Sequence, residues 1–347
     1  MSLLIVGNPG AVHVGAHFLE ACATRGVEAR LCDTRDAFAS SFVRQKVNWW
    51  MRGHRPARLR EFSDQVVQTV REMRPDALLT TGIAPIDAVA LRAIGALGVP
   101  RLNYLTDDPW NPAQRAPWFM DALAHYDHVF SPRRANLSDL AALGLTTTYL
   151  PFAYAPAIHF PEPAPTPEGR AACDTDVVFI GGADADRVPM VRAFIDAGLS
   201  VALYGGYWDR YVETRTHARG HLDPDGVRHA IAGARVCLGL VRRANRDGHS
   251  MRSFEVPAMA GCMLIERTDE HRALLGEDGD AVAYFGDAQE AVERARSLIA
   301  APEVAARLRT RGHSRITTGN HTYADRLMVM LAAARHLSPE QQVRAHG

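Results

Sequence analysis

The repeated alternation of short apolar stretches with amphipathic stretches constrains the fold of this chain more than any other feature. The apolar run "LLIVG" at residues 3–7 is followed by a loop and then by the helical pattern "AHFLEACATRG" at residues 16–26. Further strand patterns follow at "DALLTTG" (76–82), "RLNYLT" (101–106) and "HVFSP" (128–132). Strands that alternate with helices in this way predict a parallel sheet covered by helices on both faces.

A proline-rich segment at residues 151–172, "PFAYAPAIHFPEPAPTPEGRAA", interrupts the alternation. Proline disfavours helix interiors and central strands, so we predict a domain junction here. Beyond it the alternation restarts with "DVVFIGG", "VALYGG", "VCLGLV", "CMLIE" and "VAYFG". The length of 347 residues also exceeds the ~250–300 residues at which a single core stops growing. The sequence therefore predicts an α/β protein of two Rossmann-like doubly wound domains that face a cleft, at residues 1–160 and 161–320.

The C-terminal part of the chain carries helix-boundary signals. Asp287 and Glu290 form a predicted capping box at the start of "AQEAVERARSLIA", and Pro302 suits the first turn of the next helix. The pattern in "HTYADRLMVMLAAARHL" predicts a final helix followed by a polar tail, which together make a third segment at residues 321–347. The expected apolar face of this helix consists of Leu327, Met330, Leu331 and Ala334.

The charge balance and the cysteine spacing of the chain exclude several classes of function. Basic and acidic residues balance at 39 each, so no net field favours nucleic acid, and any anion site must be built locally. Lys46 is the only lysine, so such a site is expected to use arginine or backbone amides. The five cysteines are widely spaced without a CxxC pair, which argues for a reduced cytoplasm and against a zinc or disulfide framework.

Contact with a membrane is expected to be peripheral at most. No apolar run approaches the ~20 residues of a membrane span, and the N-terminal apolar run is too short for a signal peptide. The stretch "FVRQKVNWWMRGHRPARLR" at residues 42–60 is basic and carries paired tryptophans. We interpret it as a partly buried amphipathic helix, with contact to a membrane or to a polymeric acceptor as the alternative.

The stretch "HSMRSFEVPAMAGCMLIERTDEH" at residues 249–271 holds the most specific combination of residues. Pro257 predicts that a short helix begins close to it, and Gly261 predicts its end before a strand. Glu255 then lies at the helix N-terminus, where its carboxylate can accept hydrogen bonds from a vicinal diol such as a ribose. Arg252 can reach a diphosphate. The alternative is that Glu255 only compensates the helix dipole and that Arg252 is a solvated charge.

This stretch resembles the signature of the CgeB-type (spore maturation protein) glycosyltransferases and, more distantly, the glutamate-bearing nucleotide-sugar motif of the family that contains glycogen and sucrose synthases. The resemblance rests on "RSFEVPAMAGCMLIERT", with support from "LTDDPW" (105–110) and "GNHTYADRL" (319–327), and it is strongest over the C-terminal half. It implies the GT-B fold, with a nucleotide-sugar in the cleft and a final helix that crosses back to the first domain.

The resemblance also implies an activity. A hexosyltransferase of this kind moves a sugar from a nucleoside diphosphate to an acceptor hydroxyl, in bacterial surface-glycan or natural-product glycosylation. No metal is expected, because arginines and helix N-termini stabilise the departing diphosphate in such sites. The larger relatives use a lysine near the start of the second domain, for which Arg187 or Arg242 would substitute here, and Ala260 stands where a glycine is common.

Two loops of the second domain complete the expected donor site. "FIGGADADR" (179–187) brings a glycine pair and an arginine to the end of a strand, where a loop can meet a diphosphate, with a plain tight turn as the alternative. "LVRRANRDGHSMR" (240–252) places four arginines close to Glu255, as an anion site or as a solvated basic loop. The expected donor-binding residues are Gly181, Gly182, Arg187, Arg242, Ser250, Arg252, Phe254 and Glu255.

The first domain supplies the other candidates for catalysis, beside Arg252. His13 lies in the glycine-rich loop "GNPGAVHVG", where a base would deprotonate an acceptor hydroxyl, and an incidental loop histidine is the alternative. Asp107 and Asp108 follow a predicted strand, and Asp108 precedes Pro109, a position that suits a turn as well as catalysis. No third acid or histidine at metal-ligand spacing accompanies the two carboxylates.

Two other function classes use the same architecture. A nucleotide-sugar epimerase would interconvert its donor without an acceptor, and a non-catalytic binding or scaffold relative would bind a nucleotide without turnover. The donor sugar, the nucleobase, the acceptor and the oligomeric state are left open by the sequence, because fold analogy does not specify them.

Overall fold

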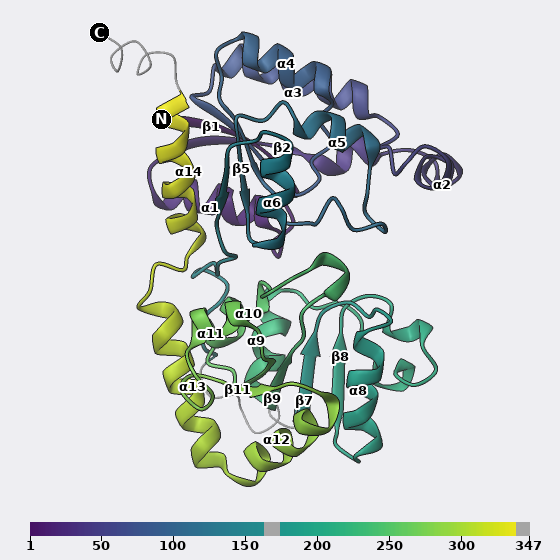
Figure 1. Ribbon diagram of the computed structural model, residues 1–347, viewed down its shortest axis with the longest axis vertical. Helices are drawn as coiled ribbons and strands as arrows, with labels where there is room; N and C mark the ends of the chain where they lie inside the picture. The colour runs from purple at the N-terminus through teal and green to yellow at the C-terminus, as the bar shows by residue number, and fades with distance from the viewer. Residues whose placement is uncertain (163–173, 338–347) are drawn as a thin grey trace. The chain divides into compact units, whose positions relative to one another are not determined.

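The computed structural model of the chain describes residues 1–162 and 174–337, which divide into two compact units (Figure 1). The first unit contains Met1–Pro151, the short segment Ala244–Arg246 and the C-terminal helix, and the second contains Phe152–Arg243 and Asp247–Thr322. The division falls at the start of the proline-rich segment, whereas the sequence placed it after residue 160. Residues 163–172 of that segment and Cys173 lie outside the described residues.

The first unit is built on a parallel sheet in the order β2-β1-β3-β4-β5-β6, which confirms the α/β class predicted from the alternation. Its strands are β1 (Ser2–Gly7), β2 (Glu28–Asp33), β3 (Ala77–Thr81), β4 (Arg101–Tyr104), β5 (His128–Ser131) and β6 (Thr147–Tyr149). Its helices are α1 (Val14–Thr24), α2 (Phe42–Met51), α3 (Leu59–Met73), α4 (Ala88–Ala96), α5 (Pro117–Leu123), α6 (Ala135–Ala142) and α14 (Tyr323–Leu337), with a 3-10 turn η1 at Thr34–Phe38.

Helices cover both faces of this sheet. Leu4 and Val6 of β1 belong to a buried cluster that includes side chains of α3, α4 and α5. The intervening side chains of Leu3 and Ile5 are also fully buried, and strand alternation directs them to the opposite face. Burial on both faces explains why β1 reads as an uninterrupted apolar run instead of an alternating one.

The C-terminal helix α14 packs on α1, so the chain returns to the first unit as predicted. The ring of Tyr323 stacks on His17 with centroids 4.8 Å apart and meets Phe18 edge-on at 5.4 Å. Arg25, which directly follows α1, forms an ion pair with Asp325 of α14 at 3.0 Å. The predicted apolar face is buried in full, through Leu327, Met330, Leu331 and Ala334.

The second unit holds a parallel sheet in the order β11-β10-β9-β7-β8. Its strands are β7 (Thr175–Ile180), β8 (Val201–Tyr204), β9 (Ala234–Gly239), β10 (Met263–Glu266) and β11 (Ala283–Phe285). Its helices are α8 (Arg187–Asp196), α9 (Pro224–Gly233), α10 (Arg252–Ala258), α11 (Asp269–Leu275), α12 (Ala288–Ala300) and α13 (Pro302–Thr317). Asp287 caps α12 by accepting from the Glu290 amide at 2.9 Å, and Pro302 opens α13, both as predicted.

Helix α10 begins earlier than the sequence predicted. It starts at Arg252, and Pro257 lies in its last turn instead of near its start. The helix has only seven residues, so the amide that Pro257 lacks costs it a single intrahelical bond. Ala260, just beyond the helix, has a φ of 56°, a left-handed conformation that glycine adopts without strain. This geometry accounts for the glycine that is common at this position in the family that the stretch resembles.

Helix α2, which the sequence predicted to be partly buried, carries both buried and exposed side chains among those that the structure describes. The side chains of Trp50 and Met51 are each 79% exposed at its C-terminal end, although Asn48 is buried. Figure 1 shows α2 projecting from the first unit. None of the helices in residues 1–162 and 174–337 has the length and apolar character needed to cross a bilayer.

Candidate functional site

The two central strands β7 and β9 of the second unit mark the position of the candidate site. Strand β7 pairs with β8 on one side and with β9 on the other, so successive connections leave β7 in opposite directions. Ligands of open parallel sheets bind beyond the carboxyl ends of the strands at such a switch point. The segments that follow the two strands here are Gly181–Gly182 and Leu240–Arg242, which belong to the two predicted binding loops.

Arg187, at the start of α8, joins the two loops. Its guanidinium donates to the Gly182 carbonyl at 3.0 Å and to the Leu240 carbonyl at 3.2 Å. The residue is 8% exposed. Burial, with a further contribution from the positive charge of Arg242, lowers the pKa of Arg187. An anion bound beside the guanidinium would offset the cost of its burial and stabilise its charged form.

Arg242 and Arg252 extend the positive charge around the glycine pair. Asp184 lies between two arginines, 3.6 Å from Arg187 Nε and 3.5 Å from Arg242 Nε. Arg252 Nε donates to the Ile180 carbonyl at 3.2 Å, at the end of β7. Three guanidinium groups therefore gather at the switch point with two carboxylates, those of Asp184 and Glu255. This arrangement supports an anion site over the solvated loop that was its alternative.

Glu255 lies in the first turn of α10, as predicted, but its side chain is almost completely buried. The residue is 1% exposed, and its carboxylate is paired with Arg252. His159 Nε2 lies 3.8 Å from the other carboxylate oxygen. His159 Nδ1 accepts a hydrogen bond from the Ala155 amide, which leaves Nε2 as the protonated nitrogen that faces Glu255. Arg252 is therefore held by a buried partner and is not a solvated charge.

Two further predicted binding residues support α10 from outside the arginine cluster. The Phe254 side chain is fully buried, with its ring centroid 5.6 Å from those of His249 and His321. The Phe254 ring therefore packs within the second unit. The Ser250 amide donates to Ser253 Oγ at 3.1 Å, so Ser250 belongs to the turn that leads into the helix.

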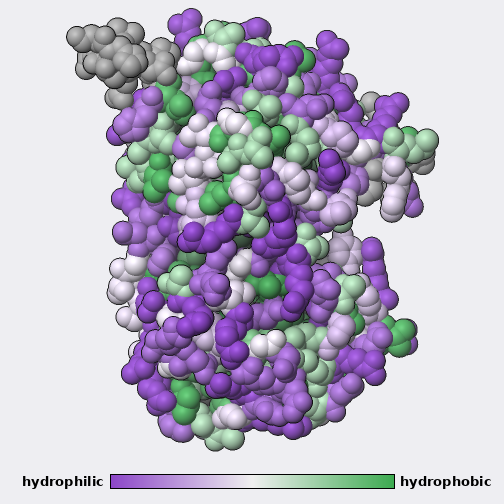
Figure 2. Space-filling view, viewed as in Figure 1, coloured by the Kyte–Doolittle hydropathy of each residue, from purple (hydrophilic) through white to green (hydrophobic). Residues whose placement is uncertain are grey.

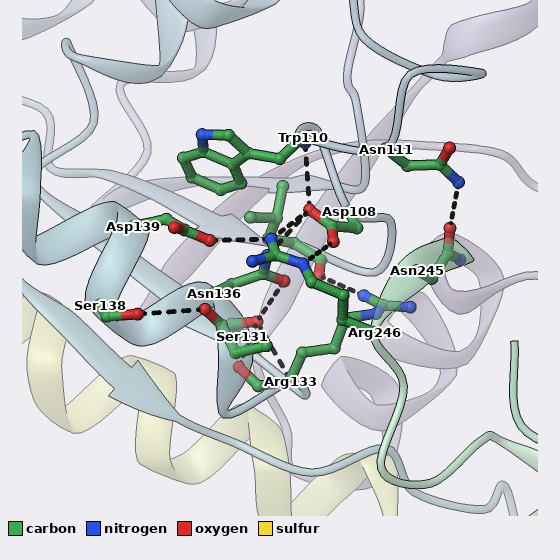
Figure 3. Close-up of polar contacts among 12 residues, drawn as sticks. Asp108, Trp110, Asn111, Ser131, Arg133, Asn136, Ser138, Asp139, Asn245 and Arg246 are labelled. Carbon is green, nitrogen blue, oxygen red and sulfur yellow. Dashed lines mark hydrogen bonds and ion pairs between the residues drawn. The ribbon is translucent and has the colours of Figure 1, made fainter. Parts of the chain in front are cut away.

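Asp108 lies at the centre of a polar cluster in the first unit (Figure 3). It is completely buried, and its Oδ1 accepts from the Trp110 amide at 3.0 Å and from Asn136 Nδ2 at 2.9 Å. Arg246 donates to both of its oxygens, at 2.7 and 3.0 Å, and also pairs with Asp139 at 2.8 Å. These contacts support the role of Asp108 as a turn and anchor residue, and none of them supports the predicted catalytic role.

The four arginines of residues 240–252 are thus divided by the structure. Arg246 belongs to the first unit with Ala244 and Asn245, and Asn245 accepts from Asn111 Nδ2 at 2.7 Å. Arg243 pairs with Glu266 at 2.8 Å, and its side chain is 64% exposed. Arg242 and Arg252 remain next to the glycine pair, beside Arg187.

His13 and Asp107 both follow strands of the first sheet at its carboxyl edge. The switch point of this sheet lies at β1, which pairs with β2 on one side and β3 on the other. His13 immediately precedes α1 and keeps part of its surface exposed, while partial burial of the ring, together with the positive charge of Arg35, lowers its pKa. Asp107 is partly buried and accepts from Thr106 Oγ1 at 3.1 Å. Both side chains are more accessible than Asp108, and the lowered pKa favours the neutral form of His13 that can accept a proton.

Glycines allow the close approaches in the loop that carries His13. A side chain on Gly7 would place its Cβ 2.8 Å from the Gly15 Cα, and one on Gly15 would meet the backbone of Asn8 at the same distance. The strand therefore passes directly into the loop and helix only because both positions lack a Cβ. The residues that the structure describes contain no cluster of three or more His, Cys, Asp or Glu side chains suited to a metal ion.

Comparison with known proteins agrees with the two-unit architecture. The two units, each a parallel sheet with flanking helices, match solved two-unit structures along the whole length of those chains. The fold is GT-B. Sucrose-phosphate synthase from Thermosynechococcus elongatus is similar with a TM-score of 0.68, 13% identity and coverage of 100% of both chains. HepE from Anabaena, solved in complex with UDP-glucose, has a TM-score of 0.66 and 12% identity over 96% of this chain and 100% of its own.

A third GT-B neighbour belongs to a different enzyme class. UDP-GlcNAc 2-epimerase from Neisseria meningitidis, bound to UDP-GlcNAc, has a TM-score of 0.54 and 12% identity over 96% of this chain and 100% of its own. In sequence, residues 187–332 match the family described as "Glycosyl transferase-like". None of the curated proteins matches this chain significantly in sequence.

Two residues of this GT-B site were missed by sequence reasoning. Asp184 was not among the expected donor-binding residues, but it links Arg187 to Arg242. His159 lies in the proline-rich segment that the sequence marked only as a junction, yet it faces Glu255. The position of Asp184 three residues before Arg187, an expected phosphate-binding arginine, was a usable signal in the sequence. No local pattern signalled His159, because its partner is distant in the sequence.

Proposed function

We propose that this protein is a glycosyltransferase of CgeB type that transfers a hexose from a nucleoside diphosphate to an acceptor hydroxyl without a metal ion. The observation that carries the proposal is the group of Arg187, Arg242 and Arg252 at the switch point of the second sheet. Cleavage of the donor places negative charge on the departing diphosphate, and preorganised guanidinium groups stabilise such charge as it develops. The match of residues 187–332 to a glycosyl transferase-like family covers the segment that supplies all three arginines.

In this proposal the glycine pair receives the diphosphate. The Cβ that a side chain on Gly182 would add lies 3.7 Å from Arg242 Nη2, so the missing side chain leaves the backbone open toward this arginine. Backbone amides that follow a strand and guanidinium groups are both donors suited to phosphate oxygens. The complex of HepE with UDP-glucose makes this donor the first to test.

The acceptor hydroxyl needs a base if the anomeric configuration is inverted, and the first unit offers His13 and Asp107 for this step. We assign the role to His13 first, because the lowered pKa keeps its imidazole neutral near pH 7.

Four described cysteines, Cys22, Cys32, Cys237 and Cys262, are buried and free. Free thiols suit a reducing compartment, so we place the enzyme in the cytoplasm, where it would act in bacterial surface-glycan or natural-product glycosylation.

Donor turnover by the purified protein tests the proposal. A thermal-shift screen of nucleotide-sugars first identifies the donor, since a ligand at 100 times its dissociation constant adds ~2.7 kcal/mol of stability. We then expect release of the nucleoside diphosphate to require an acceptor and to continue in excess EDTA. Interconversion of the donor sugar without an acceptor would identify an epimerase, as in the Neisseria meningitidis neighbour. Activity that EDTA abolishes and magnesium restores would contradict metal independence.

The role of Glu255 is tested by Glu255→Gln, which keeps the side-chain shape and removes its charge. We expect donor binding to weaken by about 1–3 kcal/mol, because the carboxylate either binds the ribose diol or holds Arg252 in place, and both need its charge. Isothermal titration with the donor measures the change. Glu290→Gln is the matched control, since Glu290 also lies in the first turn of a helix and pairs with an arginine, Arg267, at 3.0 Å. A Glu255→Gln protein that melts earlier but binds normally would show that Glu255 only supports the helix.

A further inference from the structure

The segment from Ala37 to Arg60 differs in charge from the rest of the chain. It contains six arginine and lysine residues and no aspartate or glutamate, in a protein whose basic and acidic residues balance at 39 each. The segment includes α2 and the loop that leads to α3. Positive charge is therefore concentrated in one short part of the first unit, and no acidic side chain within the segment neutralises it.

The apolar residues of α2 that the structure places are directed to solvent. Val47, Trp50 and Met51 are 41%, 79% and 79% exposed. Their spacing of i, i+3 and i+4 puts them on one face of the helix. In an ordinary surface helix the apolar stripe faces the core. In α2 the three apolar residues are exposed, and the polar residue Asn48 is buried. An outward apolar stripe with a tryptophan marks an interaction surface.

Cationic side chains surround this stripe. Lys46, on the helix itself, and Arg52, Arg55 and Arg58, in the following loop, are all exposed. In Figure 2 the projection that corresponds to α2 combines pale and green residues with hydrophilic ones. Tryptophan and methionine next to arginine and lysine match the boundary of a bilayer, where rings and apolar chains enter below the headgroups and cations meet anionic lipid.

We propose that α2 and the loop to Arg58 form a docking surface for an anionic membrane. The apolar stripe supplies insertion at the interface, and the cationic loop supplies attraction to acidic headgroups, each too weak alone for stable attachment. Charge complementarity favours an anionic membrane over other binding partners. An apolar protein groove would match the stripe without requiring the surrounding cations, and a soluble polyanion would match the cations without requiring Trp50 and Met51.

Vesicle co-sedimentation of the full chain tests the surface. We expect binding to vesicles of phosphatidylcholine with phosphatidylglycerol, little binding to phosphatidylcholine alone, and loss of binding as salt screens the charges. Trp50→Ser with Met51→Ser is expected to reduce the partition coefficient at least about tenfold, because two large apolar side chains are removed from the interface. Arg52→Glu with Arg55→Glu is expected to abolish the preference for anionic lipid.

Matched control variants separate this surface from general effects. Val89→Ser with Val212→Ser alters two apolar residues that are 65% and 71% exposed elsewhere, and Arg307→Glu with Arg311→Glu makes the same change in net charge on α13. Both controls are expected to bind vesicles within about twofold of the unchanged protein. Failure of the unchanged protein to bind anionic vesicles at low salt would overturn the proposal. The proposal would also be overturned if the Trp50→Ser, Met51→Ser protein bound vesicles as well as the unchanged protein does. Binding to heparin that is stronger than binding to vesicles and does not depend on Trp50 would overturn it too.

Discussion

Arg252→Lys is expected to lower the maximal rate of glycosyl transfer by about 10²-fold, with a much smaller change in the donor dissociation constant. The guanidinium is fixed by the Ile180 carbonyl and by the buried Glu255 carboxylate, so it is held in place before charge develops on the diphosphate. Lysine keeps the charge but cannot contact both partners and a phosphate oxygen with a planar fork. The loss should therefore fall on the chemical step, and single-turnover kinetics at saturating donor measure it.

The control for this substitution is Arg267→Lys, which changes an arginine that pairs with Glu290 at 3.0 Å and whose side chain is 44% exposed. We expect its rate to stay within about twofold of the unchanged enzyme, since exposed ion pairs contribute little. A normal rate for Arg252→Lys would exclude this residue as the clamp and would direct the search to Arg187 and Arg242.

Asp108→Ala is expected to lower the free energy of unfolding of the first unit by about 3 kcal/mol. The substitution removes a completely buried carboxylate and leaves Asn136 Nδ2 and the Trp110 amide without their acceptor, while Arg246 keeps its ion pair with Asp139. Removal of a buried acceptor costs more than its hydrogen bonds contribute, because a buried donor such as Asn136 Nδ2 stays desolvated without a partner. Equilibrium denaturation by urea measures the change in the free energy of unfolding.

Asp139→Ala provides the comparison, because Asp139 pairs with the same arginine at 2.8 Å but its side chain is 28% exposed. We expect it to cost less than about 1 kcal/mol. An Asp108→Ala protein with normal stability but no activity would restore the catalytic role that the sequence suggested for Asp108.

The fold could be predicted from sequence because both sheets are parallel and buried on two faces. Strands such as β1 and β7 then read as apolar runs that end at a glycine, and each is followed by a helix with its own boundary signals. The predicted boundary after residue 160 lies beyond the division at Pro151 and Phe152, because proline content marks a segment and not the residue at which contacts change units.

The site was harder to predict, because the role of each residue depends on the direction and the burial of its side chain and not on its residue type. Asp107 and Asp108 are adjacent and chemically identical, yet the first is partly exposed and the second is enclosed by Arg246 and Asn136. Arg242 and Arg246 follow the same strand, but only a three-dimensional structure places the second in the first unit. The burial of Asp108 and the position of Arg246 depend on contacts with residues that are distant in the sequence. A local sequence pattern does not show such contacts.

The position of α14 in the first unit has a consequence for protein synthesis. The ribosome completes β1 to β6 and the helices between them early, but the helix that covers α1 is translated only after the whole second unit. At about 5–20 residues per second, this delay lasts on the order of ten to forty seconds. During that time His17 and Phe18 lack the Tyr323 ring that packs on them in the finished protein. The nascent first unit therefore presents an open apolar face to chaperones until the last helix emerges, and a premature stop codon before α14 leaves that face open permanently.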